Sequence, residues 1–253
     1  MKAGDRDLRA MRRLIVEGAQ HSCEPELLLP SATLDGLRSL LGCDAVSVGV
    51  IDSTQRSARP WQDLPAETGD GGPDLLAVFF RHYWDCVPCA YPDRSGDLDS
   101  VIKISDFYSA RQYRDTGMWS EYFAPAGVAH HMTVCLAGTP GRTLRLAAFR
   151  DTGRDFTDRD RTILWLLRPH LYQMYRQRRA ARSGAADLTQ RQRELLRLVA
   201  VGHTDRQIGR RLGIAESTVR KHLQHVFERL QVTNRAAAAA AVRDFDEDAL
   251  PVE

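Results

Sequence analysis

The sequence has no long hydrophobic run. None of its apolar stretches approaches the roughly 18 residues that a helix needs to cross a lipid bilayer. The first residues, MKAGDRDLRAMRR, carry charges of both signs and lack the apolar segment and small-residue cleavage site of a secretory signal. We therefore expect a cytoplasmic protein without a membrane partner.

Cysteine and lysine are also scarce. Five cysteines are an odd number, and the cytosol keeps thiols reduced, so we do not expect a structural disulfide framework. Lysine occurs only at Lys2, Lys103 and Lys221, so arginine carries nearly all the positive charge and a single arginine is weak support for a phosphate site. The chain has no nucleophile elbow, P-loop or HExxH motif. We expect no enzyme activity, no cofactor and no metal.

Length and charge divide the chain into two parts. Its 253 residues, 43% of them hydrophobic, suffice for two modest domains. Residues 187–243 contain eleven Arg or Lys and five Asp or Glu, a formal charge of +6, whereas the last ten residues contain five acids and no base. A basic segment rich in small residues lies between the two parts. We predict domains over 1–178 and 187–243, a linker over 179–186 and an acidic tail over 244–253.

The C-terminal part has the local signals of four short helices. Thr189 with Gln192, and Thr204 with Gln207, form capping boxes that satisfy free backbone N–H groups at helix starts. Leucine, valine and isoleucine recur at helical spacing in the segments that follow these capping boxes. A short helix, a turn at Gly213 and a longer helix make the helix-turn-helix pattern, in which the second helix enters the major groove of DNA.

The stretches LTQRQRELL, VAVGHTDRQIGRRLGI, STVRKHLQHVFERL and VTNRAAAAAA resemble the C-terminal DNA-binding domain of LuxR-type transcriptional regulators. The resemblance covers nearly all of Leu188–Val242. It implies a four-helix domain that binds inverted-repeat double-stranded DNA as a homodimer. Transferred to this sequence, it implies base contacts by Arg220, Lys221 and Gln224, and phosphate contacts by Thr204, Arg206, Thr218 and Arg235.

The alanine run that follows is either a strong helix former or a close-packed dimer face. Small side chains let two helices approach, so we predict dimer contacts by Ala237, Ala238 and Ala241. The acidic tail is expected to be solvated. A contact between this tail and RNA polymerase stays open as an alternative.

The N-terminal part predicts an α+β domain. Helices are expected over 8–20, 32–41, 75–86 and 155–177, strands over 45–52 and 101–105, and a hairpin over 130–138 and 143–151, with a loop after residue 52. A phosphorylated receiver domain is disfavoured because Lys103 is the only central lysine and the strand pattern does not fit. An antiparallel sheet with flanking helices resembles a GAF-type sensor. The predicted fold class is α+β, a GAF-like sheet domain followed by an all-α four-helix domain.

The stretch HYWDCVPCAYPD contains the pair Cys86 and Cys89. Redox enzymes place such a pair at the start of a helix, whereas here it is predicted to follow one, and a zinc site would need two further ligands. We favour packed or pocket-lining thiols over a redox switch, and a switch over a metal site. The residues predicted to form a ligand pocket or switch are Tyr83, Trp84, Cys86, Cys89, Trp119 and His131.

These features together suggest a sequence-specific DNA-binding regulator. Its N-terminal domain would sense a small molecule and control a dimeric helix-turn-helix. Two alternatives stay open: a redox- or metal-responsive regulator that uses Cys86 and Cys89, and a regulator controlled by a protein partner.

Overall fold

The computed structural model describes residues 4–20, 27–65, 72–151, 153–182, 188–230, 232 and 234–239. The chain divides into two compact units, Met1–Tyr175 and Arg176–Glu253. The predicted α+β class is confirmed, because the first unit combines a sheet with helices and the second is helical in its described residues. Across the described ranges, no helix is both long and apolar enough to span a membrane.

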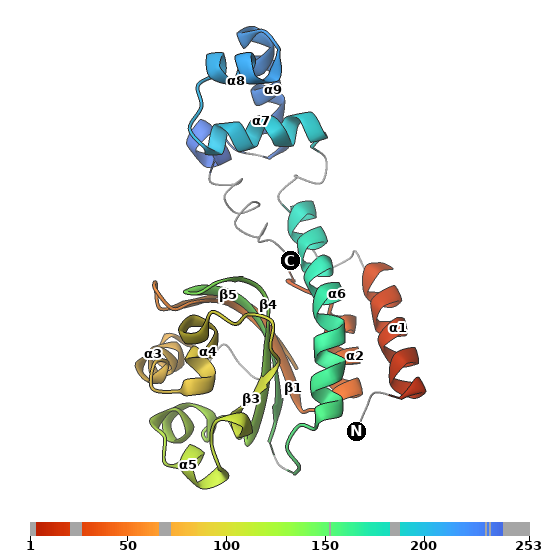
Figure 1. Cartoon of the computed structure of the whole chain (residues 1–253), viewed down its shortest axis with the longest axis vertical. Coiled ribbons are helices and arrows are strands. Elements are labelled where there is room, and N and C mark those ends of the chain that lie inside the picture. Colours follow the sequence, from red (N-terminus) through yellow and green to blue (C-terminus); the bar gives the residue numbers. More distant parts are fainter. Residues whose placement is uncertain are drawn as a thin grey trace. The chain divides into compact units, whose positions relative to one another are not determined.

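An antiparallel five-stranded sheet in the order β2-β1-β5-β4-β3 forms the centre of the first unit (Figure 1). Its strands are β1 (Ala45–Asp52), β2 (Ser57–Leu64), β3 (Ile102–Lys103), β4 (His130–Thr139) and β5 (Arg142–Arg150). The predicted hairpin is confirmed as β4 and β5. The segment predicted as a loop after residue 52 contains β2, which is an edge strand. An edge strand tolerates Pro60, which has no N–H to donate, because only one side of the strand pairs with a neighbour.

Three helices cover one face of the sheet: α1 (Asp5–Gln20), α2 (Ser31–Leu41) and α6 (Asp158–Arg182). Alternate strand residues such as Val48, Val134 and Leu146 pack with them in one buried core. Helix α6 continues to Arg182, so the first residues of the predicted linker 179–186 are helical.

The other face carries short helical segments (Figure 1). They are α3 (Gly72–His82), α4 (Val87–Ser95), η2 (Ile104–Asp106), α5 (Ala110–Arg114) and η3 (Met118–Phe123). The single helix predicted over 75–86 is wrong at its end, because α3 stops at His82 and α4 begins after Cys86. A second core, rich in aromatic side chains such as Tyr83, Tyr113 and Phe123, lies on this face.

The second unit contains α7 (Gln190–Ala200), α8 (Asp205–Leu212), α9 (Glu216–Arg229) and a helical segment over residues 235–239. Both capping boxes form as predicted. The Thr189 hydroxyl accepts a hydrogen bond from the backbone N–H of Gln192, and the Thr204 hydroxyl accepts one from the backbone N–H of Gln207. These caps fix where α7 and α8 begin, because each satisfies backbone N–H groups that no earlier turn can reach.

Candidate functional site

Helices α8 and α9 meet through a tight turn. Gly213 ends α8 in the left-handed conformation (φ 66°), and its amide donates to the carbonyl of Gly209. The inner faces of the two helices pack on α7 through Ile208, Val219 and Leu223. Because the apolar side of α9 is buried in this core, its polar side is left to the solvent.

The three residues predicted to contact bases lie on that polar side. Arg220, Lys221 and Gln224 are all exposed on α9. The Arg220 side chain is 69% exposed and forms a 2.6 Å ion pair with Glu216 one turn earlier, which holds it along the helix. Their positions on one exposed helix face suit insertion into a major groove, in which arginine, lysine and glutamine can bind base edges.

The predicted phosphate-binding residues fall into two groups. Thr204 and Arg206 are exposed at the start of α8, and Thr218 is half-buried in the first turn of α9. Arg235 instead connects parts of its own unit, because its guanidinium contacts Asp205 at 2.6 Å and donates to the carbonyl of His203. Any phosphate contact of Arg235 therefore has to form beside this ion pair.

The three alanines predicted to contact a second copy differ in their burial. Ala238 is fully buried in the core of its own unit, with Leu196 and Val226, which argues against a contact with a second copy. Ala237 is half-buried. Ala241 and the acidic tail 244–253 lie outside the described residues, so their proposed roles stay predictions.

The first unit contains a cavity of about 110 Å³ on the sheet face that carries α3 and α4. An engineered protein cavity of roughly 150 Å³ binds benzene, so this space suits a small molecule. Its apolar walls include Ile51, Leu76, Phe79, Phe123 and Phe149.

Polar groups interrupt these walls at a few points. The indole N–H of Trp61 donates to the Asp63 carboxylate at 2.8 Å, and the Ser47 hydroxyl donates to the same oxygen. Trp61 and Asp63 both line the cavity, together with Arg145 and His131. A mostly apolar cavity with a few fixed polar groups is the usual form of a small-molecule site.

Arg145 projects from β5 and is 4% exposed. Its guanidinium donates to the Cys89 carbonyl and to the Tyr83 hydroxyl, both at 2.6 Å, and the Tyr83 hydroxyl donates to Asp93 at 2.7 Å. The Asp93 carboxylate also accepts from the Gly141 amide at 2.9 Å. This buried network connects α4 to β5, and sequence reasoning missed it.

Sequence reasoning found part of the cavity. Cys89 and His131 line it as predicted. Tyr83 is not part of the cavity lining and is fully buried in the hydrogen-bond network with Arg145. Trp84 is 48% exposed, and Trp119 packs on the Tyr113 ring with centroids 5.1 Å apart, so neither belongs to the cavity lining.

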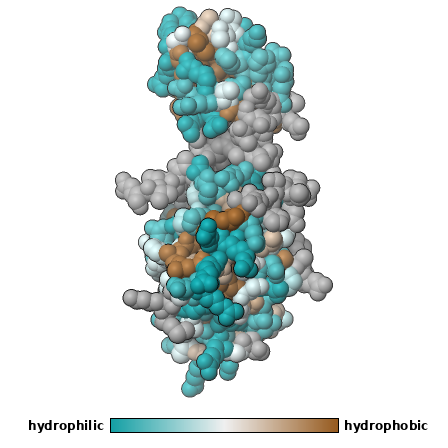
Figure 2. Space-filling model, turned by 90° about the vertical axis from the view of Figure 1, so that its right-hand side faces the viewer, coloured by the Kyte–Doolittle hydropathy of each residue, from teal (hydrophilic) through white to brown (hydrophobic). Residues whose placement is uncertain are grey.

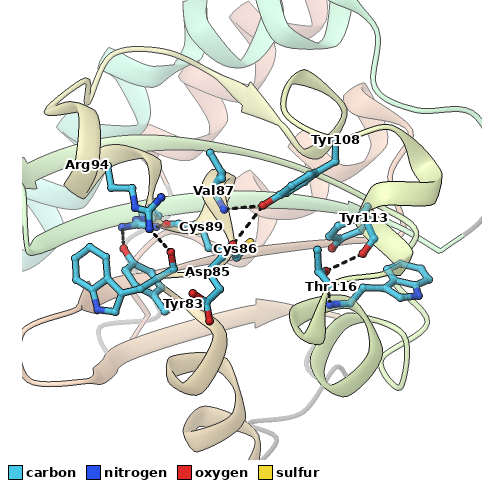
Figure 3. The surroundings of a disulfide bond; sticks show 12 residues. Tyr83, Asp85, Cys86, Val87, Cys89, Arg94, Tyr108, Tyr113 and Thr116 are labelled. Carbon is cyan, nitrogen blue, oxygen red and sulfur yellow. Dashed lines mark hydrogen bonds between the residues drawn. A yellow bond between two sulfur atoms is a disulfide. The ribbon is translucent and has the colours of Figure 1, made fainter.

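The pair Cys86 and Cys89 forms a disulfide (Figure 3). Cys86 is the N-cap residue of α4, and Cys89 lies in the first turn. The expectation that this pair only follows a helix is therefore wrong, since α4 starts there. The neighbouring amide of Val87 donates to the Tyr108 hydroxyl at 3.0 Å. Among the described residues, no group of three or more His, Cys, Asp or Glu could hold a metal ion.

Acid is expected to destabilise the first unit through His131. Burial, together with the nearby positive charge of Arg145, lowers the pKa of this imidazole to about 4. Between pH 6.5 and 4 the unfolded chain binds a proton here that the folded chain does not, so the free energy of unfolding falls as the pH falls, by roughly 3 kcal/mol in all.

Urea denaturation between pH 7 and pH 4 measures this loss. We expect His131→Gln to remove most of it, and His170→Gln, at an exposed position on α6, to retain it. An unchanged pH dependence in the His131 variant would show that other groups cause the loss.

Residues 186–242 match the sequence profile described as "Bacterial regulatory proteins, luxR family". They form a LuxR-type DNA-binding domain. The resemblance found in the sequence is thereby confirmed for this part of the chain. The LuxR-type domain is 49% identical over 53 residues to the probable transcriptional regulatory protein SgaR of Hyphomicrobium methylovorum, and 42% identical over 55 residues to the nitrate/nitrite response regulator NarL of Escherichia coli K12.

The curated relatives share only this part of their length. The match to SgaR covers 21% of this chain and 25% of that protein, and the match to NarL covers 22% and 26%. The chain therefore spans about a quarter of each relative, and the likeness concerns the LuxR-type domain alone.

A likeness of fold extends over both units. The structure of SdiA in complex with octanoyl-rac-glycerol aligns with a TM-score of 0.55 at 15% identity and covers 96% of each chain. A second structure, of Escherichia coli SdiA, aligns with a TM-score of 0.52 at 13% identity, over 96% of this chain and 99% of that one. At these identities the comparison shows a shared fold only.

Proposed function

We propose that this chain is a sequence-specific DNA-binding transcriptional regulator whose N-terminal unit responds to a small molecule. One observation carries the proposal: in a domain that matches the luxR family, α9 buries its apolar side and exposes Arg220, Lys221 and Gln224. Because bacterial DNA lies in the cytoplasm, the proposed regulator acts there.

The cavity of the first unit supports the ligand-binding part of this proposal. It is mostly apolar and has polar groups at His131 and at Trp61 and Asp63, the last two held together by a hydrogen bond. The SdiA structure with the same fold contains octanoyl-rac-glycerol, a molecule with an apolar chain and a polar head. We infer a small ligand that combines an apolar body with one or two hydrogen-bonding groups, in keeping with the volume of about 110 Å³.

The proposed regulator is a homodimer, since LuxR-type domains are expected to bind inverted repeats. Large apolar side chains are exposed on α1, at Leu8 and Val16, and on α6, at Trp165 and Leu166. Figure 2 shows hydrophobic areas within an otherwise mainly hydrophilic face. These side chains on α1 and α6 are candidates for a contact between two copies.

Removing two charges from α9 tests the DNA-binding part. We expect Arg220→Ala with Lys221→Ala to weaken binding to a mixed-sequence duplex at least about tenfold at low salt and to reduce its dependence on salt, because fewer counterions are released. Fluorescence anisotropy at several salt concentrations measures both effects.

The matched control is Arg111→Ala with Arg114→Ala, which removes the same charge from exposed positions on α5, outside the surfaces proposed to contact DNA or a second copy. This control should bind as the wild type does. Equal losses in the two double variants would mean that net charge, and not α9, determines binding.

A further inference from the structure

Cys86 and Cys89 meet as a buried disulfide at the start of α4. We propose that this pair is a reversible redox site, opened and closed by exchange with low-molecular-weight thiols and disulfides, and that its state alters the ligand cavity through Arg145. The inference rests on the proposed function, because a protein that acts on DNA works where thiols are kept reduced and where disulfides are mostly transient or redox-sensing.

The position of Cys86 favours opening of the bond. It is the N-cap of α4, where the positive end of the helix dipole stabilises negative charge. A Cys86 thiolate released there is a good leaving group, and a stabilised thiolate speeds thiol–disulfide exchange.

The cavity supplies a route to the buried bond. Cys89 is part of the cavity lining, whereas Cys86 is 1% exposed and does not line it. A small thiolate that enters the cavity attacks the Cys89 sulfur, forms a mixed disulfide and releases the Cys86 thiolate, which takes up a proton. A second thiol then attacks the reagent's sulfur and releases Cys89 as a thiol. The protein gains two electrons and two protons, and the reagent leaves as its disulfide.

Arg145 connects this site to the cavity. Its guanidinium donates to the Cys89 carbonyl at 2.6 Å, and one turn later on α4 the Asp93 carboxylate lies 3.8 Å from the same guanidinium. Arg145 itself lines the cavity. Opening the disulfide frees the first turn of α4, so the Cys89 carbonyl and the side chain of Arg145 can shift. By reciprocity, a ligand that prefers one cavity shape favours one redox state.

Two other cysteines provide internal controls. Cys43 and Cys135 are buried free thiols, and burial raises the pKa of Cys43 to about 12 and that of Cys135 to about 11. Both are therefore protonated near neutral pH and react slowly.

Trapping in glutathione mixtures tests the redox site. The full-length protein is equilibrated with reduced and oxidised glutathione at several ratios, alkylated without unfolding, and digested for mass spectrometry. We expect Cys86 and Cys89 to become labelled together as the ratio becomes more reducing, while Cys43 and Cys135 stay unlabelled. A pair that is labelled only after unfolding, or equally in every mixture, overturns the proposal.

Hydrogen exchange tests the coupling. Reduction should speed amide exchange in α4 about tenfold, as expected when a short disulfide loop is opened, and should leave α9 unchanged. Cys86→Ser with Cys89→Ser should give the reduced pattern in every mixture. If this variant does not fold, the comparison of wild type in the two buffers decides. Equal exchange in both buffers contradicts the coupling. Neither readout uses DNA, so these results and those on α9 can fail separately.

Discussion

Replacing Arg145 with methionine is expected to lower the free energy of unfolding of the N-terminal unit by about 3–5 kcal/mol. Methionine retains much of the apolar volume, but it leaves the Asp93 carboxylate, whose side chain is 3% exposed, without its cation. It also removes the donors to the Cys89 carbonyl and the Tyr83 hydroxyl. Urea denaturation of the full-length protein, followed by tryptophan fluorescence, measures the change.

Two further variants show whether the loss comes from the buried charge. Adding Asp93→Asn to the methionine variant removes the uncompensated carboxylate, so the double variant should be less destabilised than the sum of the two single changes. Arg154→Met, at an exposed position, should change the free energy by less than about 0.5 kcal/mol. A methionine variant as stable as wild type would mean that the network contributes little to stability.

Leu195→Ala is expected to abolish DNA binding without changing a residue on the DNA-facing side of α9. Leu195 is fully buried in the core formed with Ile208 and Val219. The truncation costs about 2–5 kcal/mol, which is a large part of the stability of so small a domain.

Thermal unfolding followed by circular dichroism should lose the transition of the LuxR-type domain and retain that of the first unit. Val201→Ala is the matched control, because the Val201 side chain is 76% exposed and its truncation leaves no cavity. If the Leu195 variant binds DNA with wild-type affinity, an intact core around Leu195 is not required for DNA binding.

The LuxR-type domain could be predicted closely because its signals are local. Thr189 and Thr204 fix two helix starts through contacts three residues away, and Gly213 ends α8 with its own backbone angle. The burial of Ala238 could not be predicted, since small side chains suit a helix interface within one chain as well as between two.

The first unit was predicted less well because its decisive contacts join distant segments. Strand β2 has Pro60 within it, and its pairing with β1 is visible only once the sheet is assembled. Strand alternation does place Arg145 on the face opposite Leu144 and Leu146. Nothing in the sequence pairs it with Tyr83, which is 62 residues away.

Selection from a pool of random duplexes by the full-length protein tests the central claim most directly. The proposed dimeric regulator should enrich one inverted repeat, and the variant with Arg220→Ala and Lys221→Ala should enrich none. The centres of the two half-sites should lie about one helical turn of DNA apart, or a multiple of that distance. Recovery of no common sequence by the folded wild-type protein, or of the same sequence by the variant, would contradict sequence recognition by α9.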